Sequence, residues 1–321
     1  MPLPGSKSAL DRLGVRLVSG DSISDDDLAD LARIVDAYQD VLNRVKLRLT
    51  ELGFSATARI KTTGTLVDKL RRETARFSQV QDLAGARIVV PDRAAQDDAT
   101  SRIANAFEAA GCTCKVIDRR QHPSHGYRAV HIVLQVDKVP VEIQVRTDLQ
   151  DSWAQLVERL ADIWGRGIRY GDEPDAPDSL VGGLTSRRDV VSLLMQLSDA
   201  VAEVEEQRAS LMKTAEELTQ TLTAADALAG AGGRGGDWII DDTIPGELLA
   251  SMDQTMADLK SELIPLFTGW RRMTGAQFAD ALRSGYQLAR QDHDRREAEL
   301  GSVELRLRDI LGELAAAIGQ E

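Results

Sequence analysis

Two segments close together in the chain alternate apolar and polar residues and carry side chains that suit catalysis. They are residues 126–131, GYRAVH, and residues 141–146, VEIQVR. Alternation with a period of two is typical of a strand that buries one face. The dipeptide Asp137-Lys138 between them predicts a tight hairpin turn in which residues 136 and 139 pair.

This hairpin register brings four polar side chains to one face of the predicted sheet. His131 would lie opposite Gln144, and Glu142 would be its diagonal neighbour. Arg146 continues the same face by the period of two. A glutamate in such a place suits metal binding or removal of a proton from an attacking hydroxyl. The alternative is an ordinary solvated sheet face.

A second group of polar residues surrounds a predicted turn from strand to helix. Arg59 and Lys61 share one face of the strand, and Thr65 is expected to cap the helix that follows. Lys69 would then lie one turn into this helix. The amino end of a helix offers unpaired N–H groups and a positive dipole end, both of which suit phosphate. These residues predict an anion-binding cradle, and the alternative is a surface helix with solvated charges.

Three further residues extend this chemistry. Asp82 comes just before a predicted buried strand, and Arg87 lies within that strand. A carboxylate at a strand entrance is a common ligand for Mg²⁺ that bridges nucleotide phosphates, although it can equally anchor a loop. Tyr127, next to a glycine, can stack on a flat ligand such as a base or can form the edge of a core. Taken with the cationic residues, these side chains describe a phosphoryl-transfer site, which works by positioning and by neutralising charge.

The composition excludes several classes of protein. The chain has 321 residues, 43% of them hydrophobic, yet none of its segments approaches the ~18 uninterrupted apolar residues of a membrane-spanning helix. The first residues lack the apolar run of a secretory signal. Cys112 and Cys114 have no distant partners, which excludes a disulfide framework and favours a cytoplasmic location. A net charge of −12 argues against sequence-independent binding of DNA or RNA.

The apolar pattern divides the chain into three predicted regions. Residues 1–54 contain an amphipathic helix, which Ser24 is expected to cap and which is expected to pack on the next region. Residues 55–178 mix strands and helices in the irregular order of an α+β fold. Residues 179–321 are almost wholly helical in pattern, with a glycine-rich link at 230–246. The predicted strands of the middle region are 56–61, 84–90, 114–118, 129–136 and 140–147, and its predicted helices are 65–75, 94–110 and 149–164.

The motifs of the middle region resemble the synthetase domain of the RelA/SpoT family, particularly its small, synthetase-only alarmone synthetases. Five segments occur in the family's order and spacing: ARIKTTGTLVDKLRR, DLAGARIVV, DRRQHPSHGYRAVHIV, VEIQVRT and WAQLVERL. The resemblance implies a nucleotidyltransferase-like α+β fold, in which helices flank a mixed five-stranded sheet, followed here by an all-helical extension. It also implies Mg²⁺-dependent transfer of pyrophosphate from ATP to the 3′-hydroxyl of GDP or GTP, which makes the alarmone (p)ppGpp.

The same resemblance implies a role for each candidate residue. Arg59 and Arg87 would enclose the adenine of ATP, and Asp82 would bind Mg²⁺. Glu142 would activate the 3′-hydroxyl or share the metal, so that Glu142, Asp82 and Lys69 form the catalytic set. The other roles are nucleotide contacts: Lys61, Thr65 and Lys69 at the ATP phosphates, Tyr127 stacked on the guanine, His131 near the acceptor, and Gln144 and Arg146 at that end of the pocket.

Departures from the family pattern leave alternatives open. Thr65 stands where serine is usual, and His125 stands where asparagine is frequent, which bears on the choice of acceptor. The residues before the motifs contain no histidine, so the metal-dependent alarmone hydrolase of the long family members is not expected. One alternative is transfer to the 3′ end of tRNA, and another is a non-catalytic, nucleotide-binding regulatory module. A homo-oligomer through the helical regions is expected. The tRNA alternative would need a basic patch, for which the candidates are Arg71, Arg72, Arg119 and Arg120.

Overall fold

The structure is a computed structural model that describes residues 5–19, 23–73, 76–183, 185–231 and 275–318. The chain divides into two compact units. The first lies within residues 1–201 and 311–321, and the second lies within residues 202–310. From residue 232 onward, the predicted glycine-rich link lies outside the described residues.

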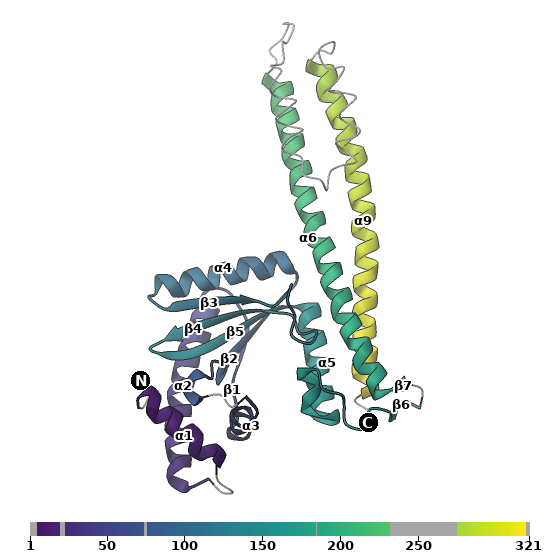
Figure 1. Ribbon diagram of the computed structural model, residues 1–321. Coiled ribbons are helices and arrows are strands. Elements are labelled where there is room, and N and C mark those ends of the chain that lie inside the picture. The colour runs from purple at the N-terminus through teal and green to yellow at the C-terminus, as the bar shows by residue number, and fades with distance from the viewer. Residues whose placement is uncertain (1–4, 20–22, 74–75, 184, 232–274, 319–321) are drawn as a thin grey trace. The chain divides into compact units, whose positions relative to one another are not determined.

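The centre of the first unit is a five-stranded mixed sheet (Figure 1). Its strands are β1 (Ala56–Ile60), β2 (Ala84–Val90), β3 (Thr113–Asp118), β4 (Val130–Val136) and β5 (Val139–Thr147). The spatial order is β1-β2-β5-β4-β3, in which β2 and β5 run parallel and the other neighbours run antiparallel. The predicted mixed five-stranded sheet is therefore confirmed.

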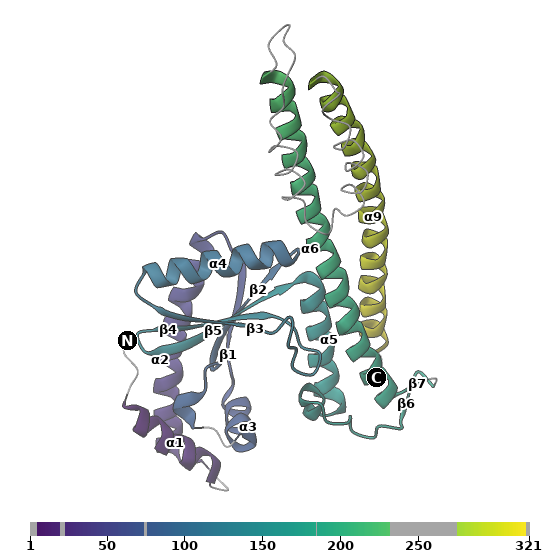
Figure 2. The same cartoon turned by 45° about the horizontal axis from the view of Figure 1, so that its top comes forward.

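Helices cover the two faces of this sheet differently. On the apolar face lie α2 (Asp25–Glu51) and α4 (Arg93–Ala109), as Figure 2 shows. The period of two explains why, since alternate residues of β2 such as Ala86 and Ile88 are buried in the core with side chains of both helices. The intervening residues of β2 and β5 face the opposite way, toward α5 (Asp148–Trp164). The polar residues that the sequence analysis identified lie on this second face.

The hairpin between β4 and β5 has the predicted turn and register. Asp137 and Lys138 have φ angles of 52° and 67°, the left-handed conformation that a two-residue type I′ turn requires. Val136 pairs with Val139, and His131 pairs with Gln144. The predicted register is confirmed.

The helix ends confirm one predicted cap and correct another. Ser24 caps α2, and its hydroxyl accepts a hydrogen bond from the backbone N–H of Asp27 at 3.2 Å. The predicted cap at Thr65 is wrong, because α3 (Thr63–Glu73) begins two residues earlier and Thr65 lies in its first turn. Thr62 takes the capping position: its Oγ1 accepts from the N–H of Thr65 at 3.4 Å. The run TTGT offers several hydroxyl side chains, and the period of the helix does not distinguish among them.

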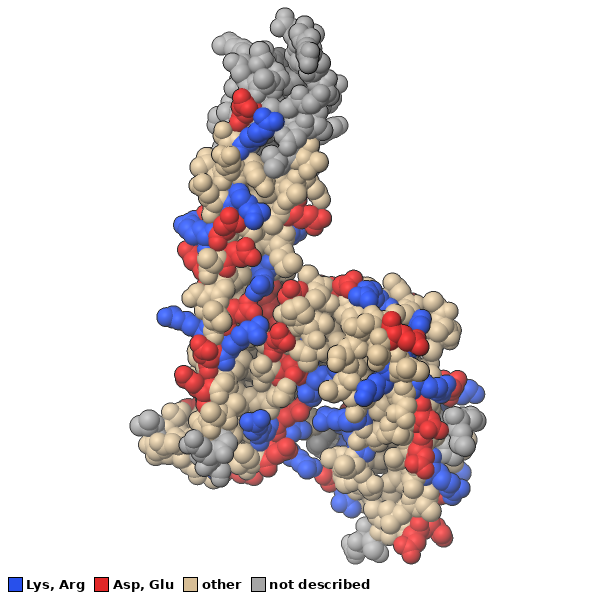
Figure 3. Space-filling view, turned by 180° about the vertical axis from the view of Figure 1, so that it is seen from behind, with Lys and Arg blue, Asp and Glu red and all other residues tan. Residues whose placement is uncertain are grey.

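The remaining elements include two long helices. These are α6 (Arg187–Ala231) and α9 (Gly275–Ile318), which lie side by side in the second unit, where an ion pair joins Arg208 to Glu304. Positive and negative side chains are interspersed over the face of the molecule that Figure 3 shows. None of the described helices is both long and apolar enough to cross a bilayer. The shorter elements are α1 (Lys7–Ser19), η1 (Phe77–Gln79), η2 (Arg166–Tyr170), β6 (Leu180–Val181) and β7 (Thr185–Ser186).

Candidate active site

A cavity of about 390 Å³ opens on the polar face of the sheet. Its walls come from α3, the segment 79–82, the strands β3, β4 and β5, the loop between β3 and β4, α5 and η2. Asp82 and Glu142, which are far apart in sequence, both border it. Seven of the eleven predicted site residues line the cavity: Lys69, Asp82, Tyr127, His131, Glu142, Gln144 and Arg146.

Five of these seven side chains form a closed set of hydrogen bonds, which we call the polar ring. Its members are Tyr127, His131, Glu142, Gln144 and Arg146. Tyr127 Oη lies 2.9 Å from His131 Nε2, and His131 Nδ1 lies 2.7 Å from Glu142 Oε1. Gln144 donates to Glu142 Oε2 at 3.1 Å. Arg146 Nη2 closes the ring by donating to Gln144 at 2.9 Å and to Tyr127 Oη at 3.2 Å.

The polar ring fixes the proton positions on its histidine. The carboxylate of Glu142 only accepts, so Nδ1 of His131 carries the hydrogen. In the neutral imidazole, Nε2 then accepts the hydrogen of Tyr127 Oη. Arg146 also covers the Tyr127 ring, with its Cζ 5.0 Å from the ring centroid. The ring therefore orients Tyr127 from its edge and from one face.

Glu142 is ionised by its surroundings despite its burial. Burial by itself would raise the pKa of this carboxyl group. The hydrogen bond and charge of His131, the hydrogen bond of Gln144 and the charge of Lys69 act in the opposite sense and lower the pKa of Glu142 to about 2. The carboxylate is a fixed negative charge at neutral pH, so it suits a cation or a hydroxyl proton donor.

The lowered pKa of Glu142 predicts a pH-dependent contribution to stability. Its ordinary pKa is 4.5 and its pKa in the fold is about 2, so the contribution is complete above pH 4.5 and is lost as the pH falls toward 2. We expect the free energy of unfolding of the wild type to lose about 2 kcal/mol from this group between pH 7 and pH 3. The Glu142→Gln variant lacks this carboxyl group, so its free energy of unfolding cannot lose this contribution. Urea unfolding of both proteins at the two pH values measures the difference, and parallel pH dependences would contradict this prediction.

Two lysines hold the other carboxylate of the cavity. Asp82 Oδ1 lies 2.8 Å from Lys69 Nζ, and Asp82 Oδ2 lies 3.3 Å from Lys61 Nζ. Lys61 follows the end of β1 and does not line the cavity, but this ion pair connects it to the cavity wall. The group combines two cations with one anion, which suits the binding of phosphate near a carboxylate.

The remaining predicted residues are not brought into the cavity. Arg59 is exposed on the edge strand β1, where it pairs with Gly85, and Thr65 contacts Thr62. Both Arg59 and Arg87 belong to the polar face by register, because Gly85 and Arg87 pair with Glu142 and Gln144 of β5.

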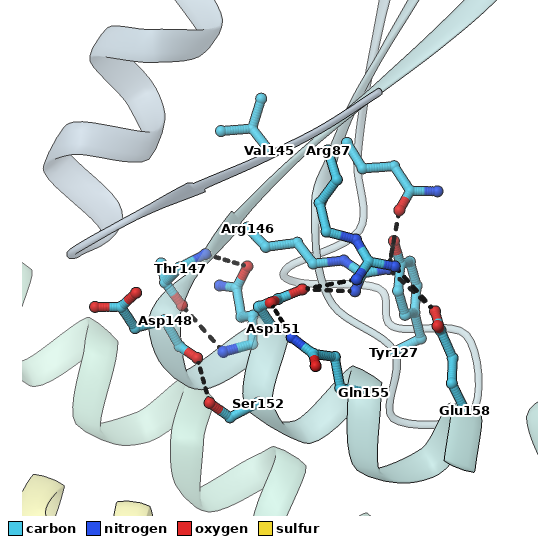
Figure 4. Close-up of polar contacts among 12 residues, drawn as sticks. Arg87, Tyr127, Val145, Arg146, Thr147, Asp148, Asp151, Ser152, Gln155 and Glu158 are labelled. Atoms are coloured by element: carbon cyan, nitrogen blue, oxygen red, sulfur yellow. Dashed lines mark hydrogen bonds and ion pairs between the residues drawn. The ribbon is translucent and has the colours of Figure 1, made fainter. Parts of the chain in front are cut away.

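Arg87 instead joins Arg146 in an ion-pair network with α5, shown in Figure 4. Asp151 Oδ1 lies 3.3 Å from Arg87 Nη1 and 3.0 Å from Arg146 Nη1. Glu158 Oε1 lies 3.2 Å from Arg87 Nη2 and 3.7 Å from Arg146 Nη2. Two arginines and two carboxylates thus balance in charge and attach α5 to the polar face of the sheet.

Several residues that line the cavity were not among the candidates of the sequence analysis. Trp153 and Glu158 come from α5, and Arg169 and Tyr170 come from η2. Arg119 was considered only for a basic patch, yet it lines this cavity too. The sequence could have indicated the residues of α5, because Asp151 and Glu158 are seven residues apart and therefore share one face of the predicted helix.

The basic patch that transfer to tRNA would need is weakened at Arg120. This residue is neutralised by Asp97 at 2.7 Å and by Asp118 at 2.6 Å. These two ion pairs leave Arg120 engaged with the protein's own carboxylates.

Comparison with known proteins gives the family of the central region. Residues 58–161 match the family model described as "Region found in RelA / SpoT proteins". This segment is a RelA/SpoT domain. It contains the strands β2 to β5, α5 to residue 161, and every residue that forms the polar ring.

Curated relatives of the RelA/SpoT domain occur in mycobacteria. An uncharacterized protein of Mycobacterium tuberculosis and one of Mycobacterium bovis are each 38% identical to this chain over 179 residues. Each match covers 54% of this chain and 64% of the relative, so it spans less than two thirds of the relatives' length.

Solved structures include similar chains from Bacillus subtilis. Small alarmone synthetase 1 is 21% identical with a TM-score of 0.45, covering 58% of this chain and 98% of that one. The same synthetase bound to its product pppGpp is 20% identical with a TM-score of 0.44, covering 57% and 97%.

Proposed function

We propose that this protein transfers pyrophosphate from ATP to the 3′-hydroxyl of a guanosine nucleotide, GDP or GTP. The observation that carries the proposal is the cavity of the RelA/SpoT domain, whose wall combines Asp82 and Glu142 with cationic groups and the ring of Tyr127. In the reaction, the bond between the β-phosphorus of ATP and the oxygen that bridges it to the α-phosphorus is replaced by a bond from the acceptor 3′-oxygen to the β-phosphorus. AMP leaves and the hydroxyl loses its proton.

The lysine side of the cavity is proposed to bind the ATP phosphates. Lys69 and Lys61 already contact the carboxylate of Asp82. The phosphates of ATP carry more negative charge than one carboxylate, so they attract the same ammonium groups more strongly. Arg59 and Arg87 extend from the polar face beside Gly85, and we propose that they enclose the adenine. For Arg87 this requires exchange of its contacts with Asp151 and Glu158.

The donor set also fits Mg²⁺. A magnesium ion in a nucleotide site takes one or two carboxylates and completes its shell with phosphate oxygens and water. Asp82 and Glu142 supply two carboxylates on one cavity, next to the lysines proposed for phosphate. When bound, the ion would neutralise charge on the transferred group.

The polar ring is proposed to receive the acceptor. Tyr127 offers its ring to the guanine, while His131 and Glu142 lie next to it for the ribose hydroxyls. A group with a pKa of about 2 is a weak base. The hydrogen bond from His131 is the largest cause that lowers this pKa, so release of this bond when the acceptor binds would raise the pKa and make Glu142 a better base.

The proposal predicts where label from ATP appears. Incubation with γ-labelled ATP and GDP or GTP should yield a labelled guanosine product and an equal amount of AMP. A 3′-deoxyguanosine nucleotide should accept no label, because it lacks the attacking oxygen, whereas the 2′-deoxy analogue keeps that oxygen. Label in tRNA would favour the other acceptor, and no label in any acceptor would leave the non-catalytic alternative.

A further inference from the structure

The first turns of α6 lie directly against the loop that carries Tyr127. Ser198 Oγ donates to the carbonyl oxygen of Gly126, and Arg128 Nε donates to Ser198 Oγ at 3.2 Å. Arg128 Nη2 lies 2.6 Å from Asp199 Oδ1. All of these residues belong to the first compact unit, which extends to Val201. Gly126 and Arg128, the residues before and after Tyr127, are thus both hydrogen-bonded to α6.

The same loop is enclosed sterically. Gly126 has a φ of 77°, and a Cβ built on it would lie 2.7 Å from the ring of Trp153 and 2.9 Å from Sδ of Met195. The indole N–H of Trp153 in turn donates to the carbonyl oxygen of Leu194 at 2.6 Å. Side chains of α5 and α6 therefore close around Gly126, and only a residue without a side chain fits between them.

We propose that residues 194–199 of α6 are a positioning element for the acceptor nucleotide. By holding Gly126 and Arg128, they set where the Tyr127 ring enters the cavity. This inference rests on the function proposed above, and it gives the start of the helical extension a part in the site of the RelA/SpoT domain. The groups proposed for ATP phosphate come from α3 and from Lys61, which follows β1, so the effect is specific to the acceptor side.

Burial decides which contact of α6 matters most. Ser198 is only 2% exposed, and it satisfies a backbone carbonyl and an arginine N–H at the same time. Loss of its hydroxyl leaves both groups without that partner at a partly buried contact. The side chain of Asp199 is 76% exposed, so solvent screens its ion pair with Arg128. Ser198 is the residue through which the positioning is tested.

The test compares Ser198→Ala with Ser192→Ala, which removes an exposed hydroxyl from the same helix. In the full chain, we expect Ser198→Ala to raise the KM for GDP and GTP about 5- to 10-fold, as befits the loss of a buried hydrogen bond. The KM for ATP and kcat should stay within about 2-fold of the wild type. Ser192→Ala should match the wild type in all three. An unchanged acceptor KM, or equal increases in both KM values, would overturn the inference.

Hydrogen exchange separates this inference from the proposed function, since it requires no turnover. In Ser198→Ala, the amides of residues 124–131 should exchange about 10-fold faster or more, while those of β2 and β5 keep their protection. If the wild type transfers no pyrophosphate to guanosine nucleotides, the proposed function fails, yet faster exchange confined to 124–131 still supports the anchoring by α6. Unchanged exchange in that segment would overturn the anchoring whatever the activity.

Discussion

Glu142→Gln is expected to lower the rate of pyrophosphate transfer at least ~10²-fold while nucleotide binding persists. Glutamine has the size of glutamate, and its amide oxygen still accepts a hydrogen bond from His131 Nδ1. Its NH2 group faces the donor Nε2 of Gln144, so the substitution keeps one of the two ring contacts of this side chain and loses the other. The substitution removes the negative charge that faces the cavity. Both roles proposed for Glu142, metal ligand and proton acceptor, need this charge, and the neutral amide supplies neither.

The measurement is kcat with saturating ATP and GTP, together with equilibrium binding of each nucleotide. The control is Glu108→Gln, which removes an exposed carboxylate from α4 on the other face of the sheet. It should leave kcat unchanged. A nearly normal rate in Glu142→Gln would show that Glu142 is not a catalytic residue. If the variant regains activity at high Mg²⁺ concentration, the metal-binding role accounts for its defect; a rate independent of Mg²⁺ points to the proton acceptor.

The β4–β5 hairpin was predictable because its chemistry follows from strand parity. The alternation of residues 126–146 fixes which side chains share a face, and the dipeptide Asp137-Lys138 fixes the register. Together these two constraints place His131 next to Gln144, as the structure has it. Local sequence patterns were sufficient here.

The partners of Arg87 and Arg146 were not predictable in the same way. Asp151 and Glu158 reach them only because α5 docks across the polar face, and the period of a strand carries no information about that docking. Helix α1 was not predicted from the sequence, for a related reason. Its Leu10, Leu13 and Leu17 are buried in the core, where α1 packs beside η1 and α3. A segment of 13 residues gains most of its stability from such tertiary packing.

Arg146→Met is expected to lower the free energy of unfolding of the first unit by about 3–5 kcal/mol, the range for breaking a buried ion pair by removing one partner. Arg146 is 1% exposed. Methionine fills much of its volume but donates no hydrogen bond. Asp151, whose side chain is also largely buried, would lose its nearer cation, and Gln144 and Tyr127 would lose a donor.

Urea unfolding of the variant measures this loss, with Arg48→Met as the control. Arg48 pairs with Glu51 on the surface of α2, where both side chains are about half exposed, so its removal should cost less than about 1 kcal/mol. A second comparison tests whether the loss comes from an unpaired carboxylate. Adding Asp151→Asn to Arg146→Met should cost less than it does in the wild type, because the two residues contact each other and their effects are not additive. Strictly additive losses would mean that Arg146 stabilises the fold by packing alone. The other four residues would then fix the geometry of the polar ring.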